Sequence, residues 1–215
     1  MMFDDGCGLT MLTLKGVKTR TSRIVPRLPE SFIRPIGLIM TGPHKGWFEY
    51  LYGAGAHGMF KPPYQIGEKI AVAQSYRTLL ESEYLPTKIE NQVIAMVEQD
   101  HKGVGNKMYV RADLMAHYIT VTGLRMERLQ YISDEDIMRE GVVKSMIGCK
   151  NLETGAEGDF AFLTVSRKNG KTTTTYNVRT TAREAFSGLI DKVCGKGVWE
   201  WNPWIWAVDY KLVRE

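Results

Sequence analysis

The chain has 215 residues, of which 44% are hydrophobic and 24% charged, and its formal net charge at pH 7 is +4. This length and balance are typical of a soluble globular protein with one large domain, and they exclude a disordered or low-complexity chain. The mild excess of positive charge is compatible with a polyanionic partner without requiring one.

The cysteines and histidines argue against a disulfide framework and a metal site. Three cysteines, Cys7, Cys149 and Cys194, are widely separated with no CxxC pair, which favours a reducing compartment. The four histidines lack the spacing of metal ligands. We expect no metal and no cofactor.

Nothing in the sequence predicts a membrane protein. The opening MMFDDGCG lacks the basic and then apolar pattern of a secretory signal. No apolar run approaches the roughly 18 residues that a membrane span needs. We therefore expect a cytoplasmic protein with no membrane partner.

The first quarter of the chain mixes short regular elements with irregular ones. Residues 9–15 predict a helical turn or two, and 19–25 predict a strand because β-branched residues dominate and Pro26 stops it. The prolines and glycines of residues 26–46 predict an irregular segment. A strand is expected over 47–53. GAGAHG at 53–58 has dinucleotide-loop spacing, but MFKPPY rather than a helix follows, so we interpret it as a glycine-rich turn.

The rest of the chain is rich in strand patterns. Further strands are expected at 67–76, 107–112, 117–129, 159–167, 172–179 and 202–213, with a bulge near Gly123. Residues 80–106 fit either a strand or a helix. Asn169-Gly170 indicates a hairpin turn. Capping-box patterns that begin at Ser133 and Thr181 predict helices ending near Gly141 and Gly195.

Strands outnumber helices, and the helices lie between strands. This order predicts an α+β fold, with a small β-barrel and short helices at its ends. We expect one domain over residues 1–215, with inserted irregular segments at 26–63 and 78–106.

Three stretches taken together resemble the ASCH domain, a member of the PUA-like superfamily. They are LTLKGVKTRTSR, YQIGEKIAVAQSY and ITVTGLRMERLQYISDEDIMREGV. The tail TAREAFSGLIDKVCGKGVWEWNPWIWAVDY is similar to the ending of ASCH-like proteins common in phages and prophages. The resemblance covers somewhat over half of the chain. It implies a PUA-like barrel whose mouth binds nucleic acid or a modified nucleoside.

The resemblance also implies site residues. Some ASCH proteins are amidohydrolases that remove the acetyl group of N4-acetylcytidine, and others are linked to RNA binding or RNA cleavage. In the amidohydrolases a Lys of GxKTxTxR is the base, a Thr three residues later is the nucleophile, and a Glu on a short helix completes the site. These roles fall on Lys18, Thr21 and Glu140. The expected ligand-binding residues are Arg20, Arg23, Gln74, Tyr76 and Arg77.

The chemistry of these residues leaves the base undecided. A Thr hydroxyl is a poor nucleophile without a nearby base, and a Lys is a base only when desolvation or a cationic neighbour lowers its pKa. Arg20 and Arg23 offer that charge, whereas Glu140 would hold Lys18 protonated. Glu140 is expected at the negative end of its helix, where a carboxylate calls for a nearby cation.

Three functions stay open. The leading one is binding of RNA or a modified nucleoside in a basic pocket, because the motif lies in the densest positive stretch, Lys15 to Arg34. The second is hydrolysis of an N4-acylated cytidine, or RNA cleavage. The third is a phage or prophage accessory role through protein partners that contact segments 26–63 and 78–106. A solvated basic strand, with an exposed Glu140 paired to Arg139 or Lys144, is the structural alternative.

Overall fold

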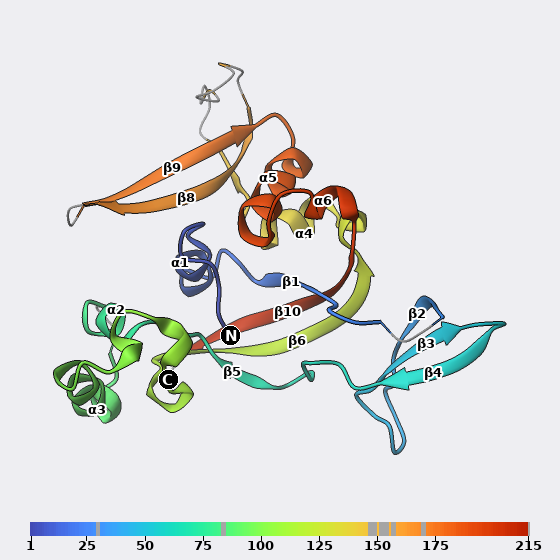
Figure 1. Cartoon of the computed structure of the whole chain (residues 1–215), viewed down its shortest axis with the longest axis horizontal. Helices are drawn as coiled ribbons and strands as arrows, with labels where there is room; N and C mark the ends of the chain where they lie inside the picture. The colour runs from blue at the N-terminus through green and yellow to red at the C-terminus, as the bar shows by residue number, and fades with distance from the viewer. Residues whose placement is uncertain are drawn as a thin grey trace.

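The computed structural model describes residues 1–28, 31–82, 85–145, 150, 155, 158–168 and 171–214. It is a mixed α+β structure with antiparallel sheets and several short helices, as the order of the sequence patterns predicts (Figure 1). The turn predicted at Asn169-Gly170 and the thiol of Cys149 lie outside the described residues.

The strands are β1 (Arg20–Ile24), β2 (Phe32–Leu38), β3 (Phe48–Tyr52), β4 (Ala56–Phe60), β5 (Lys69–Ala71), β6 (His117–Arg128), β7 (Val143–Lys144), β8 (Phe160–Lys168), β9 (Lys171–Arg179) and β10 (Trp204–Arg214). The α-helices are α1 (Leu9–Leu14), α2 (Tyr76–Leu80), α3 (Thr87–Glu98), α4 (Asp134–Arg139), α5 (Ala182–Cys194) and α6 (Val198–Trp201). Four 3-10 turns are η1 (Lys102–Val104), η2 (Lys107–Tyr109), η3 (Ala112–Leu114) and η4 (Leu129–Tyr131).

The central sheet has the order β1-β10-β6-β5, with every neighbouring pair antiparallel. The register of β10 against β6 shifts between Asp209 and Tyr210, opposite Gly123, which confirms the predicted bulge. A Cβ on Gly123 would lie 2.9 Å from the Asp209 carboxylate, so glycine leaves room for that side chain.

Two smaller sheets accompany the central one, with orders β2-β3-β4 and β7-β8-β9. Figure 1 shows the β2-β3-β4 sheet beyond one end of the central sheet, with α2 and α3 towards its other end. Among the described residues, the strand pairings close none of the three sheets, so they form no closed barrel. The fold is therefore confirmed only as α+β.

The prediction of an irregular segment over residues 26–46 is wrong, because β2 occupies its middle. Pro35 does not prevent the strand, since β2 is at the edge of its sheet and its register shifts between Pro35 and Gly37. Proline is tolerated at such edges and bulges. Likewise, the predicted glycine-rich turn at 53–58 ends early, and β4 begins at Ala56.

Two predicted strands also differ from the structure. The strand over 67–76 is limited to β5, since Ser75 caps helix α2 by accepting the backbone N–H of Thr78. The strand over 107–112 is absent, and 3-10 turns stand in its place. Side chains satisfy the backbone there, because Asn106 accepts from Met108 and the Tyr76 hydroxyl accepts from Arg111.

The largest hydrophobic cluster joins the central sheet to helices α1, α4 and α5. Its buried members include Leu12, Ile119, Ile137, Phe186 and Ala207. This packing fixes the carboxyl end of α4 next to the start of β1, which positions the candidate site.

The predicted capping box at Thr181 is confirmed, with the Thr181 hydroxyl and the Glu184 carboxylate each accepting the other residue's backbone N–H. Replacing Thr181 by Ala is expected to lower the free energy of unfolding by about 1 kcal/mol, because a backbone donor loses its acceptor. Urea denaturation measures the change. The neighbouring Thr180→Ala is the control, and equal losses in the two variants would contradict this role.

Candidate functional site

A tight turn places Lys18 before the first strand rather than in it. Helix α1 ends at Leu14, and two residues later Gly16 has a φ of +73°, which favours glycine. The N–H of Val17 donates to the carbonyl of Leu12. Thr19, the residue after Lys18, donates its N–H to the carbonyl of Arg139 at the end of α4. The lysine side chain is thereby directed at the carboxyl end of that helix.

Lys18 and Glu140 form a buried ion pair, with 2.8 Å between Lys18 Nζ and Glu140 Oε2. The same Nζ donates to the carbonyls of Arg20 at 2.7 Å and Glu140 at 2.6 Å. Three acceptors match the three N–H groups of an ammonium. The pair supplies the cation that Glu140 needs at the negative end of α4, and the exposed pairing with Arg139 or Lys144 is not formed.

Burial lowers the pKa of Lys18 from its usual value. The carboxylate of Glu140 opposes this shift, and the nearby charges of Arg23 and Arg20 add to it. The neighbouring arginines therefore act on the pKa of Lys18 in the predicted direction.

Thr21 and Ser22 lie beside the ion pair. The Ser22 hydroxyl donates to Glu140 Oε1 at 2.6 Å, so both carboxylate oxygens have a partner. Lys18, Thr21, Ser22 and Glu140 together line a hollow of about 180 Å³. The three predicted catalytic residues are thus brought together at one hollow.

The wall of this hollow is apolar. It is formed by Phe3, Leu9, Ile24, Phe186, Leu189, Ile190 and Val193, with Cys194 beside them. An apolar wall around a few polar groups is typical of a small-molecule site, although this volume lies below the usual range of about 300–1,000 Å³. It suits one ring or one acyl group rather than a whole nucleotide.

Arg23 also lines the hollow, and Arg20 does not. Arg23 donates to the carbonyl of Met2 at 2.6 Å and lies over the Phe3 ring. The Arg20 side chain is fully enclosed and paired with Glu127 and Asp136, and its Nε lies 3.7 Å from Glu140 Oε1. Arg20 therefore joins β1 to β6 and α4, and its position gives it an internal role.

The hollow is close to electrically neutral. Its charged lining residues are two cations, Lys18 and Arg23, and two anions, Asp4 and Glu140. The basic stretch of the sequence is not one surface patch, because Lys18 and Arg20 are buried and paired. A neutral ligand fits this balance better than a phosphate.

The structure separates the other predicted ligand residues from this hollow. Gln74 is buried and lines a different cavity, and Tyr76 is buried in a cluster with Leu79 and Val93. Arg77 is exposed on α2. A strand over 67–76 would place them along one pocket rim, but β5 ends at Ala71 and helix α2 begins at Tyr76.

Sequence reasoning missed Ser22 and the wall from α5. The signal for Ser22 was the run of hydroxyls in KTRTSR, in which only Thr21 matches the family motif. The apolar residues of α5 were indistinguishable from ordinary core positions, because a helix stripe has the same spacing whether it covers a sheet or a cavity.

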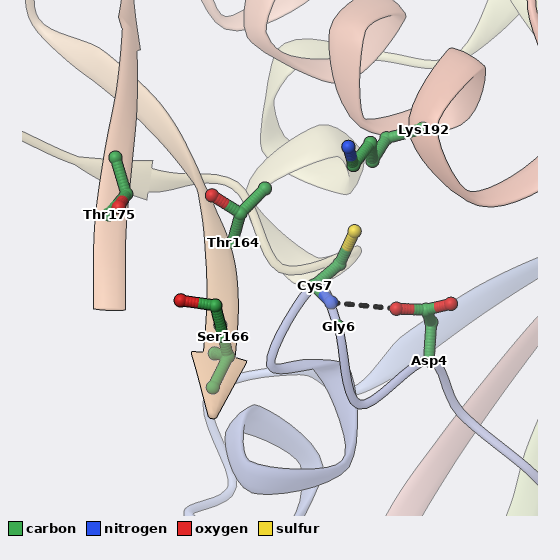
Figure 2. Close-up of a pocket in the computed structure, with 8 residues that line it drawn as sticks. Asp4, Gly6, Cys7, Thr164, Ser166, Thr175 and Lys192 are labelled. Carbon is green, nitrogen blue, oxygen red and sulfur yellow. Dashed lines mark hydrogen bonds between the residues drawn. The ribbon is translucent and has the colours of Figure 1, made fainter. Parts of the chain in front are cut away.

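A neighbouring hollow of about 390 Å³ lies under Asp4 and Cys7. Figure 2 shows Thr164, Ser166 and Thr175 of the β8–β9 hairpin on one side and Lys192 of α5 on the other. Burial and the Asp4 carboxylate raise the pKa of Cys7 to about 12. Its thiol is therefore unsuited to act as a nucleophile.

Within the described ranges, no group of three or more His, Cys, Asp or Glu side chains is arranged to hold a metal ion. The same residues contain no helix whose length and apolar character would let it cross a bilayer.

No protein-family model, curated protein or solved structure matches this chain. The resemblance to the ASCH domain therefore stays a prediction from the sequence motifs.

The ion pair gives a stability prediction. Lys18→Met or Glu140→Leu alone is expected to lower the free energy of unfolding by about 3–5 kcal/mol, because each removes the hydrogen-bonded partner of a buried charge. In Lys18→Met the Glu140 carboxylate keeps the Ser22 hydroxyl and the longer contact with Arg20 Nε, at 3.7 Å. The double variant is expected to lose much less than the sum. Denaturant titration of all four proteins measures the coupling.

Additive losses, to within about 0.5 kcal/mol, would contradict the buried pair. Lys15→Met is the matched control, since Lys15 is exposed beside the same turn and is expected to have little effect.

Proposed function

We propose that the hollow at Lys18 and Glu140 binds the base of a nucleoside, either free or unpaired in RNA. The observation that carries this proposal is the convergence of Lys18, Thr21, Ser22 and Glu140 on one apolar-walled hollow. A base has an apolar face and a polar edge, which match the wall and the floor of this hollow. The PUA-like fold implied by the motifs is part of the same proposal.

The charge balance of the hollow limits the class of ligand that it favours. Two cations face two carboxylates, so the site offers little net attraction for phosphate. A protein that neutralises several phosphates shows a steep dependence of affinity on salt. Recognition of a base in this hollow is instead expected to depend weakly on salt.

Calorimetric titration with cytidine, N4-acetylcytidine and a short single-stranded RNA tests the proposal. Cytidine or N4-acetylcytidine is expected to bind with an affinity that changes less than about twofold between 50 and 200 mM salt. Glu140→Gln and Thr21→Val are expected to weaken binding about tenfold or more, because each alters the polar floor.

Arg77→Ala is the matched control, since Arg77 is exposed on α2 and lies outside the hollow. The absence of nucleoside binding at 50 mM salt would overturn the proposal. RNA binding that is as tight in Glu140→Gln and Thr21→Val as in wild type would also overturn it.

Deacylation of an N4-acylated cytidine is the second candidate, favoured by the hydrogen bond from Ser22 to Glu140. In this reaction a hydroxyl oxygen attacks the acyl carbon, and Glu140 accepts the hydroxyl proton and passes it to N4 as the C–N bond breaks. Water then hydrolyses the acyl-enzyme ester and releases the acid. In this mechanism Glu140 is the general base, and the Lys18 ammonium orients its carboxylate through their hydrogen bond.

The pH dependence of deacylation distinguishes the two possible bases. With Glu140 as base, activity is expected to fall on the alkaline side as Lys18 loses its proton, at a pH below the usual lysine value of about 10.4 because burial lowers this pKa. With Lys18 as base, activity would instead rise through the same pKa. Chromatography of N4-acetylcytidine and cytidine gives the rates.

Thr21→Val and Ser22→Ala identify the nucleophile in the same assay. The contact with Glu140 predicts the larger loss, about a hundredfold or more, for Ser22→Ala. A wild-type protein that leaves N4-acetylcytidine intact would end this second proposal without affecting the binding proposal.

A further inference from the structure

A separate cavity of about 530 Å³ lies between α1, the start of α2 and the β8–β9 hairpin. Its lining residues are Asp5, Gly6, Gly8, Thr10, Met11, Leu14, Gln74, Ser75, Thr78, Val165, Arg167, Thr172 and Thr174. It shares none of them with the hollow at Lys18. Its volume falls within the range of ordinary small-molecule sites.

Gln74 is the group in this cavity that points to a ligand. The residue is buried, with a relative exposure of 4%, yet it lines the cavity. The amide Oε1 lies 3.3 Å from His117 Nδ1, and the backbone N–H of Gln74 contacts Met115 Sδ. Among the described residues, no acceptor takes the Nε2 hydrogens of Gln74.

Gln74 Nε2 is not among the fully buried side-chain atoms that lack a partner, so this donor is open to the cavity that Gln74 lines. His117 holds the other end of this amide, which orients the donor before any ligand binds. The cavity therefore offers one pre-oriented hydrogen bond to an acceptor atom.

The other lining groups set the remaining chemistry. Met11, Leu14 and Val165 supply apolar contacts, and threonine hydroxyls surround them. The two charged lining residues already have partners, since Asp5 pairs with Lys107 and Arg167 lies 3.8 Å from Glu81. A charged ligand would compete with these pairs, whereas a neutral one would not.

We infer that this cavity is a second ligand site, which takes a small neutral molecule with a flat ring and a carbonyl oxygen that accepts from Gln74 Nε2. The inference does not depend on the function proposed for the hollow at Lys18.

Two-dimensional NMR titration of the full chain with uracil and benzamide tests the inference, with toluene as a ring that has no acceptor. Uracil or benzamide is expected to shift the backbone signals of Met11, Gln74 and Val165 with saturation. Gln74→Leu is expected to weaken this binding about tenfold, because the donor is lost. Toluene is expected to bind no better to wild type than to Gln74→Leu.

Two substitutions at neighbouring positions of β9 test whether the ligand binds in this cavity. Thr174 lines the cavity, whereas Thr173 is also exposed but does not line it. Thr174→Trp is expected to abolish the shifts and Thr173→Trp to keep them. Thr21→Val, in the other hollow, is expected to leave this binding unchanged, which separates the two proposals.

Several results would overturn the inference. These are the absence of saturable shifts with both uracil and benzamide, equal affinity of wild type and Gln74→Leu for these two ligands, or binding of toluene to wild type as tight as that of uracil and benzamide. If a tryptophan variant fails to fold, as judged by thermal melting, the comparison of wild type with Gln74→Leu still decides the matter.

Discussion

The Lys18 ammonium and the Glu140 carboxylate form a buried ion pair, and the segments around them supply hydrogen-bond partners to both ions. Taking either charge out of water costs several kcal/mol unless partners replace the hydration. The Lys18 ammonium donates to a carboxylate and two carbonyls, and the Glu140 carboxylate accepts from that ammonium and from the Ser22 hydroxyl, with Arg20 Nε 3.7 Å away. These contacts bring the turn after α1, strand β1 and the end of α4 together, although Lys18 and Glu140 are far apart in sequence.

The same pair explains why the hollow can serve as a binding site. An apolar wall from α5 and the amino-terminal segment meets a floor in which polar atoms are already fixed. A ligand that enters finds oriented hydrogen-bonding groups and loses little to their rearrangement. Arg20 supports the arrangement from behind through Glu127 and Asp136, so its enclosed charge serves the geometry of the site.

Sequence patterns correctly predicted the local features that depend on one or two residues, such as helix caps and a β-bulge. The capping residues at Ser133 and Thr181 and the bulge at Gly123 agree with the structure. The grouping of Lys18 with Glu140 came instead from the family resemblance, and local patterns left open whether the two side chains meet. The wrong predictions concern segments whose secondary structure is determined by tertiary contacts. Pro35 was read as a break although an edge strand tolerates it, and residues 107–112 had strand-like composition but no strand to pair with. Gln74 lies outside the hollow because β5 ends at Ala71, and Tyr76 and Arg77 lie in helix α2.

Nitrogen NMR of the lysine side chains tests the central claim most directly, because it observes the Lys18 Nζ itself. A protein labelled with ¹⁵N-lysine, with Lys18→Met to assign the signal, is titrated with cytidine. The account predicts one Nζ signal whose protons exchange slowly with water, since the group is enclosed and hydrogen bonded, and this signal shifts as cytidine binds. A Lys18 signal that exchanges as fast as those of surface lysines and does not respond to cytidine would contradict both the ion pair and the site built on it.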